Sequence, residues 1–320
     1  MLPYERRAYV ARDATACGRT LRRVSALAAF LRLSRPLFLY GGFAGVALGA
    51  AVAAWSGRRL DIATYLWVQA LVTAFHLMVH YANDYFDREG DAAGGRTAWS
   101  GGSGVLAAGA LRPRVALLAA LVCAALGLAL TARFALAGNG AVAAAGAAIF
   151  ALAWGYSAPP VRFAARGLGE LATVLVVAVL VPCAGYAAFT ARVDAGLLKA
   201  LAGPALAMFA MMLCVELPDA GTDYLAAKRT LVVRWGPAAT WRVVLVAAAT
   251  AVLLSAAQAW KAGGLGGVAA MLPALVAGAA LIRSAGHDPR PASMAFGGVA
   301  LYAATVTGLA AAYALGATGR

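Results

Sequence analysis

Charged residues are scarce in this chain of 320 residues: Asp, Glu, Lys and Arg make up 12% of it, while 63% of the residues are hydrophobic. Soluble globular domains carry roughly 25% charged residues. The low charge content excludes an ordinary soluble protein, and we predict a polytopic membrane protein. Its apolar runs are rich in Gly and Ala, which allow helices to approach closely in lipid.

Cysteine is also rare, and its placement excludes several classes of site. The four cysteines show no spacing typical of a metal site or a redox motif. Three of them fall inside apolar runs, where we interpret them as small core residues. They are Cys17, Cys123, Cys183 and Cys214.

Acidic residues are the scarcer of the two charge signs, with 13 Asp and Glu against 27 Lys and Arg, which gives a net charge of +14. Such an excess of positive charge fits a nucleic-acid-binding protein. However, the basic residues cluster between apolar runs and in the N-terminal arm, a distribution typical of membrane proteins. We therefore predict a lipid bilayer, and no nucleic acid, as a partner.

Nine apolar runs have close to the 20 or so residues that a membrane-spanning helix needs. The predicted fold class is therefore an all-α polytopic membrane bundle of about nine transmembrane helices. Residues 1–35 are predicted to form a basic N-terminal arm or an interfacial helix, and residues 36–316 the membrane domain. The runs are 36–55, 63–82, 114–132, 139–156, 168–189, 197–216, 239–259, 264–283 and 292–316.

The basic residues also predict the orientation of the bundle. With the N-terminus in the cytoplasm, 20 of the 27 Lys and Arg fall on the cytoplasmic side, as the positive-inside rule requires. This places the protein in the cell (inner, cytoplasmic) membrane. Both acidic clusters described next then lie on the cytoplasmic side, after the second and sixth spans.

The first acidic cluster is Asn83-Asp84-Tyr-Phe-Asp87-Arg-Glu-Gly-Asp91, at the end of the second span. The spacing of three and four residues puts its carboxylates on one face of a helix. Several like charges near a membrane core are unfavourable unless a partner neutralises them. Clustered carboxylates with an amide suit a hard cation such as Mg²⁺.

A second acidic cluster follows the sixth span. Asp219 and Asp223 are four residues apart, and Lys228-Arg229 follows them. Two such clusters at matching ends of two membrane helices predict a shared metal site, and the basic pair predicts an anion held beside the metals. The alternative, an ordinary pair of solvated loops, is disfavoured by the clustering of one charge sign at membrane helix ends.

These motifs resemble those of the UbiA superfamily of intramembrane prenyltransferases. The family's N-D-x-x-D-x-x-x-D motif is similar to residues 83–91, and its D-x-x-x-D motif with a following K-R-T-L-x-V-R-x-G is similar to 219–236. Residues 156–162 and 166–170 also resemble family sequences. The segment 99–106 resembles the branch that prenylates 1,4-dihydroxy-2-naphthoate. The resemblance covers about residues 30–316.

The resemblance implies an enzyme that transfers a prenyl group from a prenyl diphosphate donor to a small aromatic acceptor such as a naphthoate quinone precursor, with Mg²⁺ as cofactor. It implies a first Mg²⁺ site at Asn83, Asp84, Asp87 and Asp91 and a second at Asp219 and Asp223. It makes Lys228, Arg229 and Arg162 ligands of the diphosphate. Tyr156 is expected either to stabilise a cation or orient a phosphate, or to be an ordinary interfacial tyrosine.

Other polar residues have no assigned role in the motifs. His76 and His80 are four apart but lack further zinc ligands, so we expect supporting or packing roles. Glu170 and Glu216 lie at span ends. The Gly-rich segment 99–104 is either a mobile lid or a plain loop.

Two departures from the family pattern bear on the acceptor. Val215 stands where the branch often has Asn, and Ala227 replaces a Gly, which predicts a helical conformation there. Two alternatives remain open: a membrane terpene cyclase or transfer to a non-aromatic lipid, and, more remotely, a cation transporter.

Overall fold

The structure is a computed structural model that describes residues 25–93, 102–225, 227–284 and 291–319. Every regular element in these ranges is a helix, which confirms the predicted all-α class. The first half contains α2 (Ala26–Leu33), η1 (Pro36–Leu39), α3 (Tyr40–Trp55), α4 (Ile62–Ala93), α5 (Pro113–Leu136), α6 (Gly140–Ser157), η2 (Phe163–Arg166), α7 (Gly169–Thr173), η3 (Val174–Leu180) and α8 (Val181–Thr190). The second half contains α9 (Ala195–Glu216), η4 (Leu217–Asp219), α10 (Ala220–Leu225), α11 (Leu231–Ala270), α12 (Leu272–Ser284) and α13 (Pro291–Thr318).

Eight helical stretches in the described part of the chain are long and apolar enough to cross a membrane. The remaining predicted span, 264–283, is divided between the end of α11 and the 13-residue α12. α11 ends at Ala270, and Pro273 near the start of α12 has no N–H to continue the helical hydrogen bonding. Gly263 and Gly264, whose backbone angles are not helical, kink α11 at the start of this span. Residues 1–24 of the predicted basic arm lie outside the described residues.

The predicted span 168–189 is not a uniform α-helix. Its middle, Val174–Leu180, is π-helical, and Pro182 follows it at the start of α8. Proline has no N–H to donate to the preceding turn, and a π-helical turn is one way in which a long helix accommodates such a loss. Here α7, η3 and α8 together make one continuous stretch from 169 to 190.

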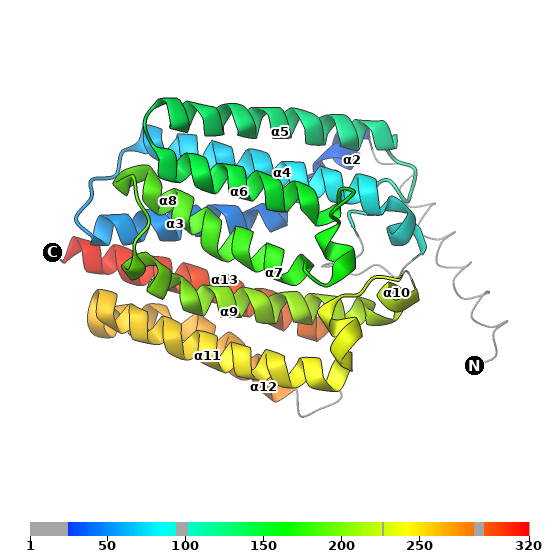
Figure 1. Ribbon diagram of the computed structural model, residues 1–320. Helices are drawn as coiled ribbons and strands as arrows, with labels where there is room; N and C mark the ends of the chain where they lie inside the picture. The colour runs from blue at the N-terminus through cyan, green and yellow to red at the C-terminus, as the bar shows by residue number, and fades with distance from the viewer. Residues whose placement is uncertain (1–24, 94–101, 226, 285–290, 320) are drawn as a thin grey trace.

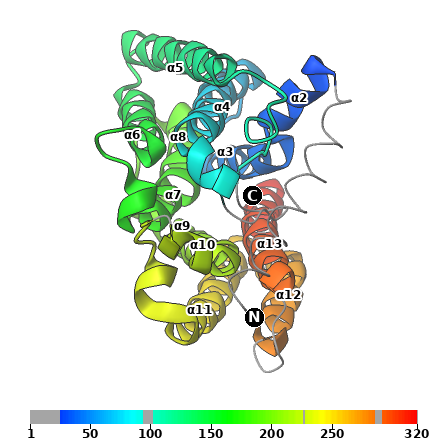
Figure 2. The ribbon, with the colours of Figure 1, turned by 90° about the vertical axis from the view of Figure 1, so that its right-hand side faces the viewer.

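The bundle has two halves that meet along α3, α8, α9 and α13. One apolar core joins α3 and α8 to helices α4–α6, and the other joins them to helices α9–α13. Figure 1 shows the long helices running side by side, with α10 and the end of α4 at the same end of the molecule. Figure 2 looks onto that end and shows both elements near the centre of the view.

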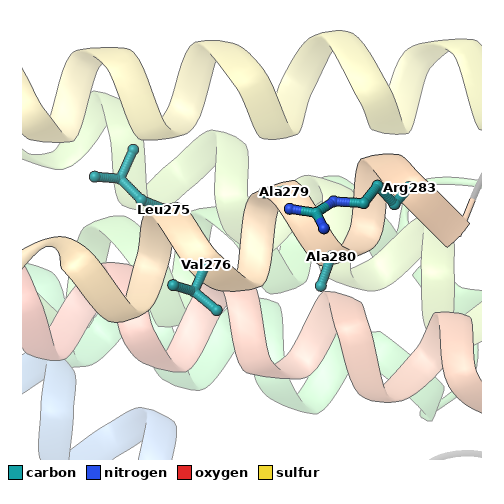
Figure 3. Close-up of a pocket in the computed structure, with 5 residues that line it drawn as sticks. All are labelled: Leu275, Val276, Ala279, Ala280 and Arg283. Atoms are coloured by element: carbon teal, nitrogen blue, oxygen red, sulfur yellow. The ribbon is translucent and has the colours of Figure 1, made fainter.

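Large apolar side chains also cover the outside of the bundle, as expected for a surface in contact with lipid. Leu121 and Val122 on α5 and Leu253 on α11 are exposed. A hollow on the outer face of α12 belongs to this surface (Figure 3). It is lined by Leu275, Val276, Ala279, Ala280 and Arg283, and neither acidic cluster contributes to it.

The contact between α3 and α8 depends on glycine at two positions. A Cβ at Gly49 would overlap the backbone of Pro182 and Tyr186, and a Cβ at Gly185 would lie 2.6 Å from the carbonyl oxygen of Val46. Such close backbone approach is the usual means of packing helices in lipid.

We therefore expect Gly49→Ala to destabilise the protein by about 1–3 kcal/mol, because the added methyl group forces α3 and α8 apart. The measurement is the unfolding of the purified protein in detergent. Gly266→Ala is the matched control, since a Cβ there meets nothing within 4 Å. Equal stability of the two variants would contradict the packing argument.

Candidate active site

The first acidic motif lies on α4, where its polar side chains bind one another and α6. Asn83 Nδ2 donates to Asp87 Oδ2 at 2.6 Å and to Ser157 Oγ at 2.8 Å. Ser157 Oγ donates to Asp87 Oδ2 at 3.2 Å. The first bond joins residues four apart, which share one face of a helix. Asp87 is buried, and these bonds fix the direction of its carboxylate.

Asp84 is 3% exposed and is held from two other segments. Arg35 forms an ion pair with its carboxylate, and Ser103 donates its hydroxyl and its backbone N–H, the latter at 3.1 Å. Arg35 also donates to Asn83 Oδ1 at 3.3 Å. The backbone of Arg35 has a left-handed φ of 46° just before Pro36, which turns the chain between α2 and η1 and brings the guanidinium to α4.

Arg35, Ser103 and Ser157 were not predicted as site residues. Sequence reasoning counts Arg35 with the basic arm and treats Ser103 as part of a Gly-rich lid or loop. The available signal was Arg35 itself, because an Arg at the start of the first apolar run needs a partner near the membrane. Residues 99–101 of the predicted lid 99–104 lie outside the described residues.

The second acidic motif lies between α9 and α11. Asp219 ends the short turn η4, and Asp223 lies in α10. Lys228 Nζ is 3.6 Å from Asp223 Oδ1, and the Lys228 backbone N–H donates to the Asp223 carbonyl at 2.9 Å. Lys228, a basic residue of this motif, therefore pairs with Asp223, the second of its two acids.

Ala227 corrects one prediction. A helical conformation was expected there, but Ala227 has a left-handed φ of 55°. The chain must reverse between α10 and Thr230, the cap of α11, and the left-handed turn at Ala227 directs the Lys228 N–H back to Asp223. A left-handed conformation costs an L-residue with a Cβ about 1–2 kcal/mol.

We expect Ala227→Gly to stabilise the protein by roughly 0.5–1 kcal/mol, because glycine relieves this strain while losing some conformational entropy on folding. Ala220→Gly, at a helical position of the same connection, is the control and is expected to destabilise by up to about 1 kcal/mol. Thermal unfolding in detergent measures both. A loss of stability in Ala227→Gly would refute the assignment of strain to this residue.

The structure brings the two acidic motifs together at one end of the bundle (Figure 1). Asp87 and Asp223 are close enough to interact electrostatically, and Lys228 acts on both. Arg162, which has a left-handed φ of 48°, places Nη2 3.9 Å from Asp87 Oδ1. Three carboxylates from two helices thus alternate with the cations of Arg35, Arg162 and Lys228.

The donor atoms of this cluster fit a hard cation. Carboxylate oxygens and the Asn83 amide oxygen are the ligands that Mg²⁺ prefers. Within the described residues, however, no three His, Cys, Asp or Glu side chains converge as a metal centre. In this arrangement the carboxylates of Asp84, Asp87 and Asp223 bind basic side chains instead.

Three further predicted residues lie at or beside the cluster. Asp91 belongs to α4, but its side chain lies outside the described residues. Tyr156 is within electrostatic range of Asp87. Arg229 has an exposed side chain, and its backbone N–H donates to the Ala165 carbonyl at 3.0 Å.

The two histidines of α4 lie one turn from the cluster. Their rings are 4.9 Å apart, and His80 Nδ1 lies 3.0 Å from the Ser34 carbonyl oxygen. His80 also meets the ring of Phe38 edge-on. These contacts support the packing role expected for the pair, in which His80 fixes the turn that carries Arg35.

Comparison with known proteins decides the family. The profile of the UbiA prenyltransferase family matches residues 43–304. The chain belongs to the UbiA prenyltransferase family. This confirms the resemblance seen in the motifs and makes the protein a membrane-embedded prenyltransferase. No curated protein matches it significantly by sequence.

Solved structures of UbiA proteins share the fold. A UbiA homolog from Archaeoglobus fulgidus bound to GPP and Mg²⁺ is 19% identical, with a TM-score of 0.63 over 89% of this chain and 99% of that one. A UbiA homolog from Aeropyrum pernix K1 is 19% identical, with a TM-score of 0.64 over 83% and 96%. A digeranylgeranylglyceryl phosphate synthase is 16% identical, with a TM-score of 0.64 over 93% and 100%.

Proposed function

We propose that this UbiA prenyltransferase uses Mg²⁺ to transfer a prenyl group from a prenyl diphosphate to an aromatic acceptor, with a 1,4-dihydroxy-2-naphthoate-like quinone precursor as the leading candidate. The observation that carries the proposal is the alternation of Asp84, Asp87 and Asp223 with three basic side chains at one end of an apolar bundle. A polar site beside an apolar interior suits a substrate with a charged head and a hydrocarbon tail.

The proposed ligands follow the two motifs. Asn83, Asp84, Asp87 and Asp91 hold one Mg²⁺, and Asp219 and Asp223 hold another. The homolog bound to GPP and Mg²⁺ supports the choice of metal. When bound, Mg²⁺ neutralises the carboxylates and the charge that develops on the departing diphosphate.

The basic residues are proposed to change partners when the donor binds. Arg162 and Lys228 leave the carboxylates, which the metals then neutralise, and bind phosphate oxygens together with Arg229. Charge-assisted bonds to the diphosphate become stronger as the allylic C–O bond breaks and negative charge accumulates there. The ring of Tyr156 is proposed to stabilise the allylic cation, and the surrounding apolar helices would exclude water from it.

The segment 99–106 carries the resemblance to the naphthoate branch, and Ser103 at its centre contacts Asp84. This contact would let the identity of the segment influence the acceptor side of the site. Transfer to a lipid alcohol and cyclisation of the prenyl chain use the same ionisation and differ only in what captures the cation.

The test is an assay of the purified protein in detergent. Farnesyl or geranylgeranyl diphosphate is offered with and without Mg²⁺ and with and without 1,4-dihydroxy-2-naphthoate, and the products are identified by mass spectrometry. We expect a prenylated naphthalene that requires both Mg²⁺ and the acceptor. A terpene formed without acceptor would replace the proposal by a cyclase, and turnover in EDTA would refute the metal requirement.

We also propose that the site faces the cytoplasm, because basic side chains gather there: Arg35, Arg162 and Lys228 contact its carboxylates, and Arg166 and Arg234 lie beside it. The C-terminus lies at the opposite end (Figure 1). An alkaline phosphatase fused after the last residue should therefore be active, and an inactive, stably expressed fusion would reverse the orientation.

A further inference from the structure

Glu170 is a carboxylate outside both acidic motifs, and its burial requires an explanation. It lies in α7 with none of its surface exposed. A charged group in an apolar bundle is costly unless it is well paired. Sequence reasoning found no role for it.

Its hydrogen bond is to the segment that carries the basic residues of the second motif. Glu170 Oε1 accepts a hydrogen bond from the backbone N–H of Leu231 at 2.5 Å. Leu231 follows Lys228-Arg229-Thr230 directly. A hydrogen bond to a charged acceptor is stronger than one between neutral groups, so Glu170 fixes the end of this segment.

Other contacts join the same two segments. The Arg229 N–H donates to the Ala165 carbonyl at 3.0 Å, and Arg234 Nη2 donates to the Arg166 carbonyl at 2.7 Å. Gly167, with a φ of +70°, leaves room for the Arg229 carbonyl, which a Cβ there would overlap. We call this set of contacts, between residues 165–170 and 229–234, the loop dock.

The loop dock lies next to both basic residues that face the acids. Arg162 lies just before segment 165–170, and its side chain reaches Asp87. Lys228 lies just before segment 229–234, and its side chain reaches Asp223. The distance between these two cations therefore depends on how the two segments are joined. A diphosphate bound by both cations requires that distance to be fixed before it binds.

A second carboxyl lies behind the dock. Glu216, at the end of α9, is close enough to Glu170 to interact with it electrostatically. Because α7 also packs against α9, Glu170 lies where α7, α9 and the start of α11 meet.

We propose that Glu170 is a positioning residue for the donor: through Leu231 it holds Lys228 and Arg229 at the correct distance from Arg162, so that the three can bind a diphosphate together. This inference rests on the proposed function of the site. Glu170 itself does not touch the substrate.

The test compares Glu170→Ala with Glu170→Gln. Binding of a non-ionisable prenyl thiodiphosphate in the presence of Mg²⁺ is measured by calorimetry, and donor and acceptor KM are measured separately. Glu170→Ala is expected to weaken analogue binding and raise the donor KM about tenfold, the size expected for a lost charge-assisted hydrogen bond, with acceptor KM unchanged. Glu170→Gln is expected to stay within about twofold, because its amide oxygen still accepts from Leu231.

Two further variants separate positioning from folding. Ser255→Ala, which removes a fully buried hydroxyl in the middle of α11, is expected to leave analogue binding unchanged. Arg234→Ala removes the exposed hydrogen bond between Arg234 and the Arg166 carbonyl without leaving a buried cavity. It is expected to weaken analogue binding about threefold. This second variant decides the matter if Glu170→Ala does not fold.

The outcomes distinguish the two proposals. If the wild-type protein does not bind the analogue with Mg²⁺, the proposed function fails. If the wild-type binds it and folded Glu170→Ala and Arg234→Ala bind it equally well, the positioning role alone is overturned. A Glu170→Gln variant as defective as Glu170→Ala would also overturn it, because charge rather than the hydrogen bond would then matter.

Discussion

Replacing Asp87 with Asn is expected to reduce kcat for prenyl transfer by about 10²–10³-fold, the range found when one group that stabilises a developing charge is removed. The amide keeps an oxygen that accepts from Asn83 and Ser157, so the local structure of α4 is retained. What disappears is the negative charge between Arg162 and Lys228 that is proposed to hold Mg²⁺. The loss should therefore be catalytic and not structural.

Glu89→Gln is the matched control for this variant. Glu89 lies two residues further along α4, its side chain is 85% exposed, and its ion pair is with Arg88. Glu89→Gln makes the same chemical change at a position outside the cluster, and the activity of this variant should remain within about twofold of wild type. Product formation at saturating Mg²⁺ is the measurement. Equal activity of Asp87→Asn and Glu89→Gln would remove the first motif from the chemistry.

Arg35→Ala is expected to destabilise the metal-free protein by about 3–5 kcal/mol, the cost of leaving one partner of a buried ion pair alone. Asp84 is the residue left alone, since Arg35 is its only basic partner among the described ion pairs. Divalent cation should restore part of the loss, because a metal at Asp84 supplies the missing positive charge. The measurement is detergent unfolding with EDTA and with Mg²⁺.

The control for this prediction is Arg88→Ala. Arg88 is 37% exposed and pairs with the exposed Glu89, so its removal should cost no more than about 1 kcal/mol and should not respond to Mg²⁺. A similar small, metal-independent loss in Arg35→Ala would show that Asp84 does not depend on this guanidinium.

The membrane class and the acidic motifs could be predicted because both are local properties of the sequence. Apolar runs of the right length identify spans, and spacings of three and four residues place Asp84 and Asp87 on one face of α4. The length of an apolar run, however, does not show where a helix breaks: Gly263 and Gly264 kink α11, and α11 ends at Ala270, shortly before Pro273. The predicted span 264–283 therefore did not appear as a single helix.

The partners of the acids could not be predicted because they come from distant segments. Arg35 is 49 residues from Asp84, and Ser157 is 70 residues from Asp87. Such pairs depend on how helices pack, and residue spacing carries no information about it. The prediction for Ala227 was wrong for a different reason: its residue type favours a helix, but the hydrogen bond from the Lys228 N–H to the Asp223 carbonyl requires a left-handed turn.

The order of residues along the chain has a consequence for biogenesis. Arg35 is synthesised before Asp84, and Asp223 and Lys228 emerge from the ribosome only five residues apart. Each of these acids thus meets a neutralising cation at, or soon after, its arrival at the translocon, where an unpaired carboxylate opposes insertion by about 3 kcal/mol. A nascent chain that stops after α4 should insert less efficiently once Arg35 is replaced by alanine, and a glycosylation-mapping assay would measure that difference.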